Sequence, residues 1–262
     1  MNEVLTIKQY VTADNVKKNF ESVLGAKAPQ FLASVLSACT NNKALAECAP
    51  GSVIAAAYIA ASLDLPIDSN LGFSAIVPYG KQAQFQMMYK GYIQLAIRTG
   101  LYRKMNCSEV YEDELEQYNP ITGECTFVEF KSTSMRATGQ TDKIVGYFAW
   151  FEMANGFSKS LYMTTSELEA HAKKYSASYR NGRGSKWSTD FSAMAKKTVI
   201  KLLLSKWGAL SVEMTKAIAD DQKTFRDDGS SEYGDNLKID ANEEKIAQDP
   251  FANAVKEETN ES

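Results

Sequence analysis

The chain has 262 residues, of which 44% are hydrophobic and 23% are charged, and its formal net charge is -3. Such a chain can bury one substantial core, and its longest apolar run, residues 53–62, is too short to cross a bilayer. The N-terminal residues lack the basic and apolar regions of a secretory signal, so we expect a cytoplasmic protein with no membrane contact. The four cysteines are scattered without a C-x-x-C pair, which indicates reduced thiols rather than disulfides or a zinc site.

Residues 1–70 are expected to form a helical N-terminal region. Two stretches in it, residues 28–42 and 52–66, carry apolar side chains at helical spacing. Ser52 has the residue type and position of an N-cap for the second helix, and Pro66 lies just past its expected end. We interpret these helices as scaffold.

The next segment predicts a β-hairpin followed by a helix with two different faces. Two extended runs flank the turn sequence Y-G-K-Q, which is typical of a hairpin. The helix that follows places Tyr89 and Ile93 on one stripe, which we expect to pack. Lys90, Gln94 and Arg98 lie at i, i+4 and i+8 on another stripe, which is free to bind.

Four later stretches have the composition and the turn boundaries of strands: residues 107–111, 125–130, 144–153 and 157–163. They predict a small antiparallel sheet at the centre of the protein. With the helices around it, the sheet gives an α+β fold, and we expect residues 71–219 to be one sheet-plus-helix core.

Two helices are expected on either side of a basic loop. The first begins at a capping box, for which Thr164 with Glu167, or Ser166 with Glu169, has the required spacing. The second is expected to follow Ser188 as its N-cap and to end at a glycine.

The loop itself reads H-A-K-K-Y-S-A-S-Y-R-N-G-R-G-S-K-W and contains five Lys or Arg, three aromatic residues and no carboxylate. Single-stranded DNA needs cations for its phosphates and flat side chains for its bases, and both kinds occur here. The alternatives are a solvated surface for the cations and core packing for the aromatic rings. The candidate DNA-binding residues of this loop are Lys173, Lys174, Tyr179, Arg180, Arg183, Lys186 and Trp187.

Catalytic patterns are scarce in the chain. Its single histidine, His171, excludes an H-E-x-x-H zinc pair and fits a packing or surface position better than a catalytic one. The glycines of the basic loop do not match a phosphate-binding G-x-x-x-x-G-K-[ST] motif. Asp113, Glu129 and Lys131 weakly match the D…E-x-K pattern of Mg²⁺-dependent nucleases, which leaves a nuclease as an alternative to a binding protein.

The last part of the chain differs in charge from the rest. Residues 1–219 hold 24 bases and 19 acids, a net charge of +5, whereas residues 220–262 hold 5 bases and 13 acids, a net charge of -8. The latter segment has few large apolar side chains to offset the entropy of ordering, so we expect a disordered acidic tail. Its sequence D-P-F-A-N-A-V, around Phe251, is interpreted as plain linker or as a short partner-binding peptide.

Two long motifs, I-V-P-Y-G-K-Q-A-Q-F-Q-M-M-Y-K-G-Y-I-Q-L-A-I-R-T-G and W-S-T-D-F-S-A-M-A-K-K-T-V-I-K-L-L, carry a resemblance. In order and separation they resemble the two signature regions of the RecT family of phage and prophage single-strand annealing recombinases, over residues 44–208. The resemblance points to a phage or prophage of a Gram-positive host.

The resemblance implies ATP-independent annealing of complementary DNA strands, without a cofactor and without enzymatic catalysis. It also implies a sheet-plus-helix core like that of eukaryotic annealing mediators and a homo-oligomer in the form of a ring or helical filament. The implied partners are single-stranded DNA, the annealed duplex, a 5′-to-3′ exonuclease and the host single-strand binding protein. By position, the DNA-binding role of the family falls on Gln86, Tyr89, Lys90, Arg98, Trp187, Lys196, Lys197 and Lys201.

Two further questions stay open at this point. A protein that coats single strands without annealing them fits the same basic and aromatic residues. The acidic tail either keeps the free protein soluble, masks the basic groove, docks a partner or serves as a spacer.

Overall fold

The computed structural model describes residues 6–68, 71–128, 138, 143–182, 184–209, 212–221, 223–225 and 231–233. Its helices are α1 (Ile7–Thr12), α2 (Asp14–Leu24), η1 (Gly25–Lys27), α3 (Ala28–Asn41), α4 (Lys43–Ala46), α5 (Pro50–Ser62), α6 (Tyr89–Arg98), α8 (Thr165–Tyr175), α9 (Ala177–Arg180), α10 (Lys186–Thr189), α11 (Phe191–Trp207) and α12 (Val212–Asp220). Its strands are β1 (Ser74–Tyr79), β2 (Gln82–Met87), β3 (Tyr102–Tyr111), β4 (Leu115–Asn119), β5 (Glu124–Phe127), β6 (Ile144–Met153), β7 (Ser158–Thr164), β8 (Lys223–Phe225) and β9 (Ser231–Tyr233).

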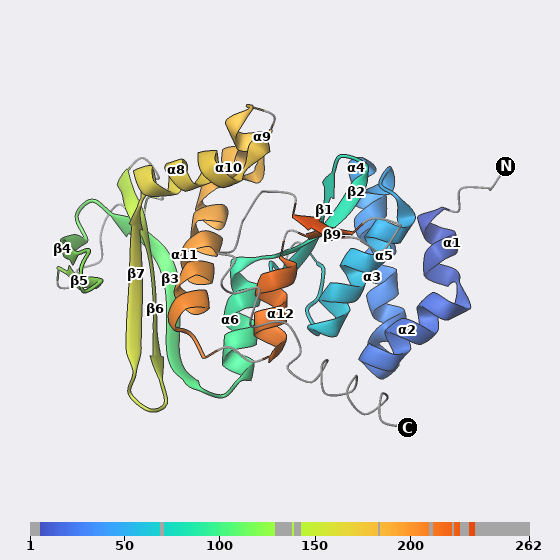
Figure 1. The fold of residues 1–262 in the computed structure, drawn as a ribbon, viewed down its shortest axis with the longest axis horizontal. Coiled ribbons are helices and arrows are strands. Elements are labelled where there is room, and N and C mark those ends of the chain that lie inside the picture. The colour runs from blue at the N-terminus through green and yellow to red at the C-terminus, as the bar shows by residue number, and fades with distance from the viewer. Residues whose placement is uncertain are drawn as a thin grey trace, which may run out of the picture.

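The strands form small antiparallel sheets. One has the order β1-β2-β8-β9, a second the order β3-β6-β7, and β4 pairs with β5. Figure 1 shows the N-terminal helices at one end of the molecule and the β3-β6-β7 sheet near the other, with α6 and α11 between them. The predicted α+β class, with small antiparallel sheets and N-terminal helices, is confirmed.

The central sheet contains three of the four predicted strands. Residues 144–153 form β6, residues 157–163 agree with β7 within one residue at each end, and residues 107–111 are the second half of β3. The prediction that residues 125–130 join this sheet is wrong for β5, which pairs with β4 in a separate hairpin. The tight turn between them brings β5 back along β4, because the Asn119 side chain accepts hydrogen bonds from the amides of Ile121 and Thr122.

The predicted capping box at the start of α8 is confirmed. The Thr164 hydroxyl accepts a hydrogen bond from the Glu167 amide at 3.2 Å, and the Glu167 carboxylate accepts one from the Thr164 amide at 2.8 Å. Each side chain therefore satisfies a backbone donor that the first helical turn leaves without a partner.

Two predicted N-caps are wrong. Ser52 lies in the first turn of α5, which begins at Pro50, and the Ser52 hydroxyl instead accepts a hydrogen bond from the Ala83 amide of β2 at 2.8 Å. Ser188 lies within the short α10, and α11 is capped by Asp190, whose carboxylate accepts from the Ala193 amide at 3.2 Å. Both serines have the right residue type, but neighbouring residues begin the helices.

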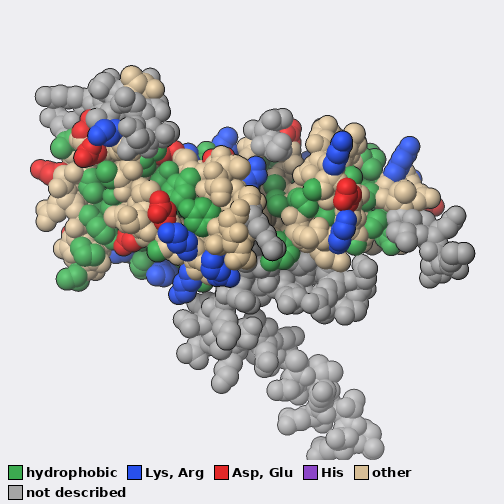
Figure 2. All heavy atoms as spheres, turned by 90° about the horizontal axis from the view of Figure 1, so that it is seen from above, with side chains coloured by type: hydrophobic (Ala, Val, Ile, Leu, Met, Phe, Trp, Pro, Cys, Tyr) green, Lys and Arg blue, Asp and Glu red, His purple; other side chains and the backbone are tan. Residues whose placement is uncertain are grey.

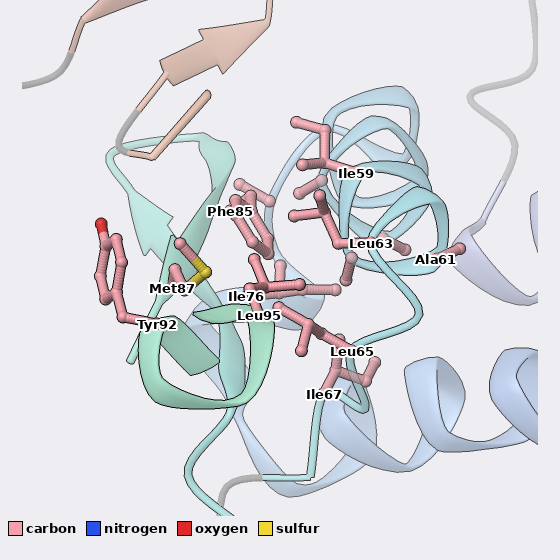
Figure 3. Packing of buried hydrophobic residues seen from close by; sticks show 14 of the residues in the cluster. Ile59, Ala61, Leu63, Leu65, Ile67, Ile76, Phe85, Met87, Tyr92 and Leu95 are labelled. Atoms are coloured by element: carbon pink, nitrogen blue, oxygen red, sulfur yellow. The ribbon is translucent and has the colours of Figure 1, made fainter. Parts of the chain in front are cut away.

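A continuous hydrophobic core runs from the N-terminal helices to α11. In Figure 3, Ile59 and Leu63 lie against Phe85 of the β1-β2 hairpin, and Leu95 of α6 belongs to the same cluster. The approach of α6 requires Gly91, since a Cβ there would overlap the backbone carbonyl of Phe73. Helix α6 is thereby held directly against the chain that enters β1.

The chain stays ordered past the expected start of the tail. Asp220 and Asp221 are buried, and β8 pairs with β2, with Thr224 opposite Gln84. The boundary expected at residue 219 therefore falls inside α12. The disorder predicted for the rest of the tail, residues 234–262, concerns residues outside the described part of the chain.

Across the described ranges, no helix is both long enough and apolar enough to span a membrane.

Candidate nucleic-acid interface

The centre of the candidate site is a buried carboxylate that receives four hydrogen bonds. Asp221 has no exposed side-chain surface, and it accepts from Lys197 Nζ at 3.0 Å and from Lys201 Nζ at 2.8 Å. The Met87 amide donates to it at 2.9 Å and the Tyr92 hydroxyl at 3.1 Å. Burial alone raises the pKa of Asp221, but the two lysines and the hydrogen bonds lower it to about 2, so the group is a carboxylate at neutral pH.

This cluster holds two residues that were expected to contact DNA. Lys197 is only 3% exposed, and the Lys201 side chain is 19% exposed. A buried ammonium needs a counter-charge, and Asp221 supplies it. Sequence reasoning missed this partner, because Asp221 was assigned to the tail and lies 20 and 24 positions along the chain from the lysines.

Lys196, the third lysine of the motif on α11, is also engaged. Its Nζ lies 2.8 Å from Glu109 of β3 and 5.2 Å from the ring centre of Tyr89. The Ser192 hydroxyl donates to the same Glu109 carboxylate. Partial burial lowers the pKa of Lys196, but the hydrogen bond to Glu109 and the negative charge of Glu109, with smaller contributions from Tyr89 and Cys107, together more than offset this and leave that pKa raised. Lys196 therefore links α11, α6 and β3.

Arg98 has a structural partner as well. Its guanidinium donates to the carbonyls of Leu63 and Asp64 at 2.8 and 2.7 Å, just after the end of α5. These contacts satisfy carbonyl groups that a helix end leaves without partners, at the negative end of the helix dipole. Gln86, on β2, is half-buried, and its amide donates to Gln84 at 3.2 Å.

The remaining cations are exposed. Lys173 and Lys174 end α8, Lys186 begins α10, and Lys90 lies in the first turn of α6. Arg180 is exposed and its guanidinium lies 3.4 Å from the carbonyl oxygens of Lys173 and Lys174, so these three residues are neighbours. Seen from above, the face that carries α8 to α10 shows a group of Lys and Arg side chains (Figure 2). Arg183 lies outside the described residues.

The aromatic residues of the loop pack against one another. Trp187 is 7% exposed and lies 5.4 Å from Phe191, 6.4 Å from Tyr179 and 6.4 Å from His171, between ring centres. The Tyr179 ring is half-buried at the edge of this group. The indole of Trp187 therefore serves as a core anchor in this structure, which was the alternative to stacking on a base.

A small hollow lies between α8 and α11, beside the Asp221 cluster. Its volume is about 70 Å³, and its lining includes His171, Tyr175, Trp187, Lys197 and Lys201. Burial, together with Lys201 and Lys174, lowers the pKa of His171 to about 4, so the imidazole is neutral at pH 7. The hollow thus has a charged side, formed by Lys197, Lys201 and their partner Asp221, and an aromatic side.

The nuclease alternative cannot be assembled from described residues. Asp113 is exposed in the turn after β3, whereas Glu129 and Lys131 lie outside the described residues. Within the part of the chain that the structure describes, no three His, Cys, Asp or Glu side chains are grouped so that they could hold a metal ion.

Comparison with known proteins identifies the chain. The model of the RecT family matches residues 29–233. The chain belongs to the RecT family. It is 48% identical over 219 residues to the uncharacterized protein YqaK of Bacillus subtilis strain 168, a match that covers 84% of this chain and 73% of YqaK. It is 26% identical over 188 residues to Protein RecT of Escherichia coli K12, covering 69% of this chain and 66% of that protein.

The predicted family is therefore confirmed for this RecT protein. RecT family membership implies a single-strand annealing recombination protein that binds single-stranded DNA.

Replacing Trp187 by Ala tests the packing role of its ring. We expect the variant to lose about 3–5 kcal/mol of unfolding free energy in urea, because the change removes a buried aromatic side chain. Affinity for single-stranded DNA per folded molecule should be retained. Phe157→Ala is the matched control and should lose much less stability, since Phe157 is 45% exposed. Unchanged stability with about 1–3 kcal/mol of lost binding would instead indicate base stacking.

Proposed function

We propose that this RecT family protein anneals complementary single strands of DNA during homologous recombination, without ATP and as a homo-oligomer. The observation that carries the proposal is the family match, which extends over residues 29–233 and so includes the basic face and the Asp221 cluster. The exposed cations at α8 to α10 support it, because they offer positive charge to a phosphate backbone.

Annealing needs no nucleotide hydrolysis, which agrees with a sequence in which no nucleotide-binding motif is recognisable. Each base-pair step releases on average ~1.4 kcal/mol, so duplex formation is downhill. The barrier comes from repulsion between two polyanions, from the self-pairing of each strand and from the search for register. A basic surface lowers the repulsion, and repetition of that surface in a ring or filament holds many bases extended at once.

In this proposal the DNA-binding residues fall into two groups. The exposed cations contact phosphates directly: Lys90, Lys173, Lys174, Arg180 and Lys186, together with Arg183 from the sequence. Tyr89, Tyr179 and Gln86 are half-buried and border the surface where bases lie. Arg98, Lys196 and Trp187 position the elements that carry these groups, by the contacts described above.

The setting we propose is the cytoplasm of a bacterial host. A 5′-to-3′ exonuclease supplies the single strands. The host single-strand binding protein coats these strands and must be exchanged for the annealing protein. Both partners are proposed from the family resemblance.

An annealing assay tests the proposed function. Labelled complementary strands are mixed with the protein, with Mg²⁺ or with EDTA, and without nucleotide. We expect duplex to form faster than in the protein-free control under both conditions. Cleavage that requires Mg²⁺ would favour a nuclease that uses Asp113, Glu129 and Lys131. Binding without acceleration would indicate a coating protein.

The exposed cations make a prediction about salt. Alanine at Lys90, Lys173, Lys174, Arg180 or Lys186 should weaken binding to single strands of any sequence, because each residue neutralises a phosphate. Each substitution removes one phosphate contact and should therefore flatten the slope of log affinity against log salt concentration by ~0.7. Fluorescence anisotropy of labelled oligonucleotides at several salt concentrations measures both effects. Lys18→Ala, at an exposed lysine of the distant α2, is the control and should leave the slope unchanged. Unchanged slopes for all five variants exclude this surface.

The acidic tail makes a separate prediction. Residues 234–262 hold eight acids and three bases, a net charge of -5, and a tethered polyanion competes with DNA at high effective concentration. Ending the chain at Tyr233 should therefore tighten binding to naked DNA at low salt, and the gain should shrink as screening reduces the range of exposed charges to ~8 Å at 0.15 M.

If the segment around Phe251 docks a partner, the same truncation should anneal naked strands well and fail on strands coated with the host binding protein. Annealing is measured at two salt concentrations on naked and on coated DNA. Equal rates in all four conditions would mean that the tail has no role in annealing.

A further inference from the structure

The Asp221 cluster contains the donors of a phosphate site. Two ammonium groups, one hydroxyl and one backbone amide converge on a pair of oxygens that carries a single negative charge. A phosphodiester also offers two charged oxygens, and lysines, tyrosine hydroxyls and backbone amides are the groups that proteins use to bind it. In this structure the Asp221 carboxylate fills that position.

Two ammonium groups share one carboxylate in the cluster. Lys197 and Lys201 bring two positive charges to one carboxylate, and His171 beside them is neutral. A buried ion pair contributes little net stability compared with apolar residues of the same size, so its presence calls for another role. Lys201 also borders the hollow between α8 and α11, through which an anion can approach.

Polar groups provide part of the contact between the segment that carries Asp221 and the rest of the protein. Among the residues of α12 whose side chains the structure describes, Thr215 and Lys216 are exposed, and Ile218 is half-buried against the core. Asp220 and Asp221, at the end of the helix, are the buried ones. When the Asp221 carboxylate leaves, the lysines keep a counter-charge provided that another anion takes its place.

We propose that Asp221 occupies the place of a DNA phosphate, and that the segment from α12 to Asp221 covers the Lys197–Lys201 pair until the backbone of single-stranded DNA displaces it. The inference rests on the proposed function and adds its regulation. The free protein thereby keeps the buried Lys197 and the partly buried Lys201 compensated, and DNA must compete with an internal carboxylate to reach them.

Asp221→Asn separates this role from a purely structural one. The amide keeps the size of the side chain but removes the charge that competes with DNA. We expect the free variant to melt at a lower temperature, because the buried Lys197 and the partly buried Lys201 lose their counter-charge, and to bind single-stranded oligo-dT at least about 5-fold more tightly, a coupling of ordinary allosteric size. Oligo-dT should also raise the melting temperature of the variant more than that of the wild type.

Asp14→Asn is the matched control. It makes the same change of charge at an exposed residue of the distant α2, and we expect the wild-type affinity and melting temperature. A lower melting temperature of Asp221→Asn with unchanged or weaker DNA binding overturns the proposal, since it shows that Asp221 only supports the fold.

Hydrogen exchange on the wild-type protein gives a test that does not depend on a variant that folds. With saturating oligo-dT, the Met87 amide should stay protected, because a phosphate takes over from Asp221 as its acceptor, whereas the amides of α12 should exchange faster than in the free protein. Equal or slower exchange of the α12 amides overturns the displacement. If the wild type binds and anneals DNA while the α12 amides stay protected, the inference alone fails. If it binds no DNA at all, the proposed function fails with it.

Discussion

The carboxylate of Asp221 is the interaction on which the centre of this protein depends. A buried charge must be neutralised and hydrogen-bonded, and here the four donors come from β2, α6 and α11. The Asp221 side chain therefore fixes the hairpin, the helix after it and the long helix relative to one another. The orientation of Lys197 and Lys201 follows from that single acid.

Sequence patterns predicted the features that depend on nearby residues. The Thr164–Glu167 capping box and the end of α11 at Gly208 involve contacts within a few positions, so residue type and spacing suffice. Pairings between distant segments were missed, because the same residue types fit several partners. Ser52 hydrogen-bonds to β2 instead of capping its helix, and β5 pairs with β4 instead of joining the central sheet.

The same limit applies to the candidate site. A lysine at helical spacing looks the same in the sequence whether it faces solvent or a buried carboxylate. Lys173 and Lys186 are exposed, whereas Lys197, from the same basic region, is enclosed with Asp221. Similarly, Trp187 lies in a loop rich in cations, yet its ring packs in the core. Sequence could therefore locate the basic surface but could not separate the residues that form it from those that support it.

Arg98 shows what this division means for substitution during evolution. Its planar guanidinium spans two successive carbonyl oxygens after α5, a geometry that the compact ammonium of a lysine does not reproduce. On the exposed face around α8, where the role that we propose needs only positive charge, arginine and lysine can replace each other. At position 98 that exchange breaks the connection between α5 and α6. We therefore expect related chains to vary between the two basic residues on this exposed face, while the identity of residue 98 is constrained by shape.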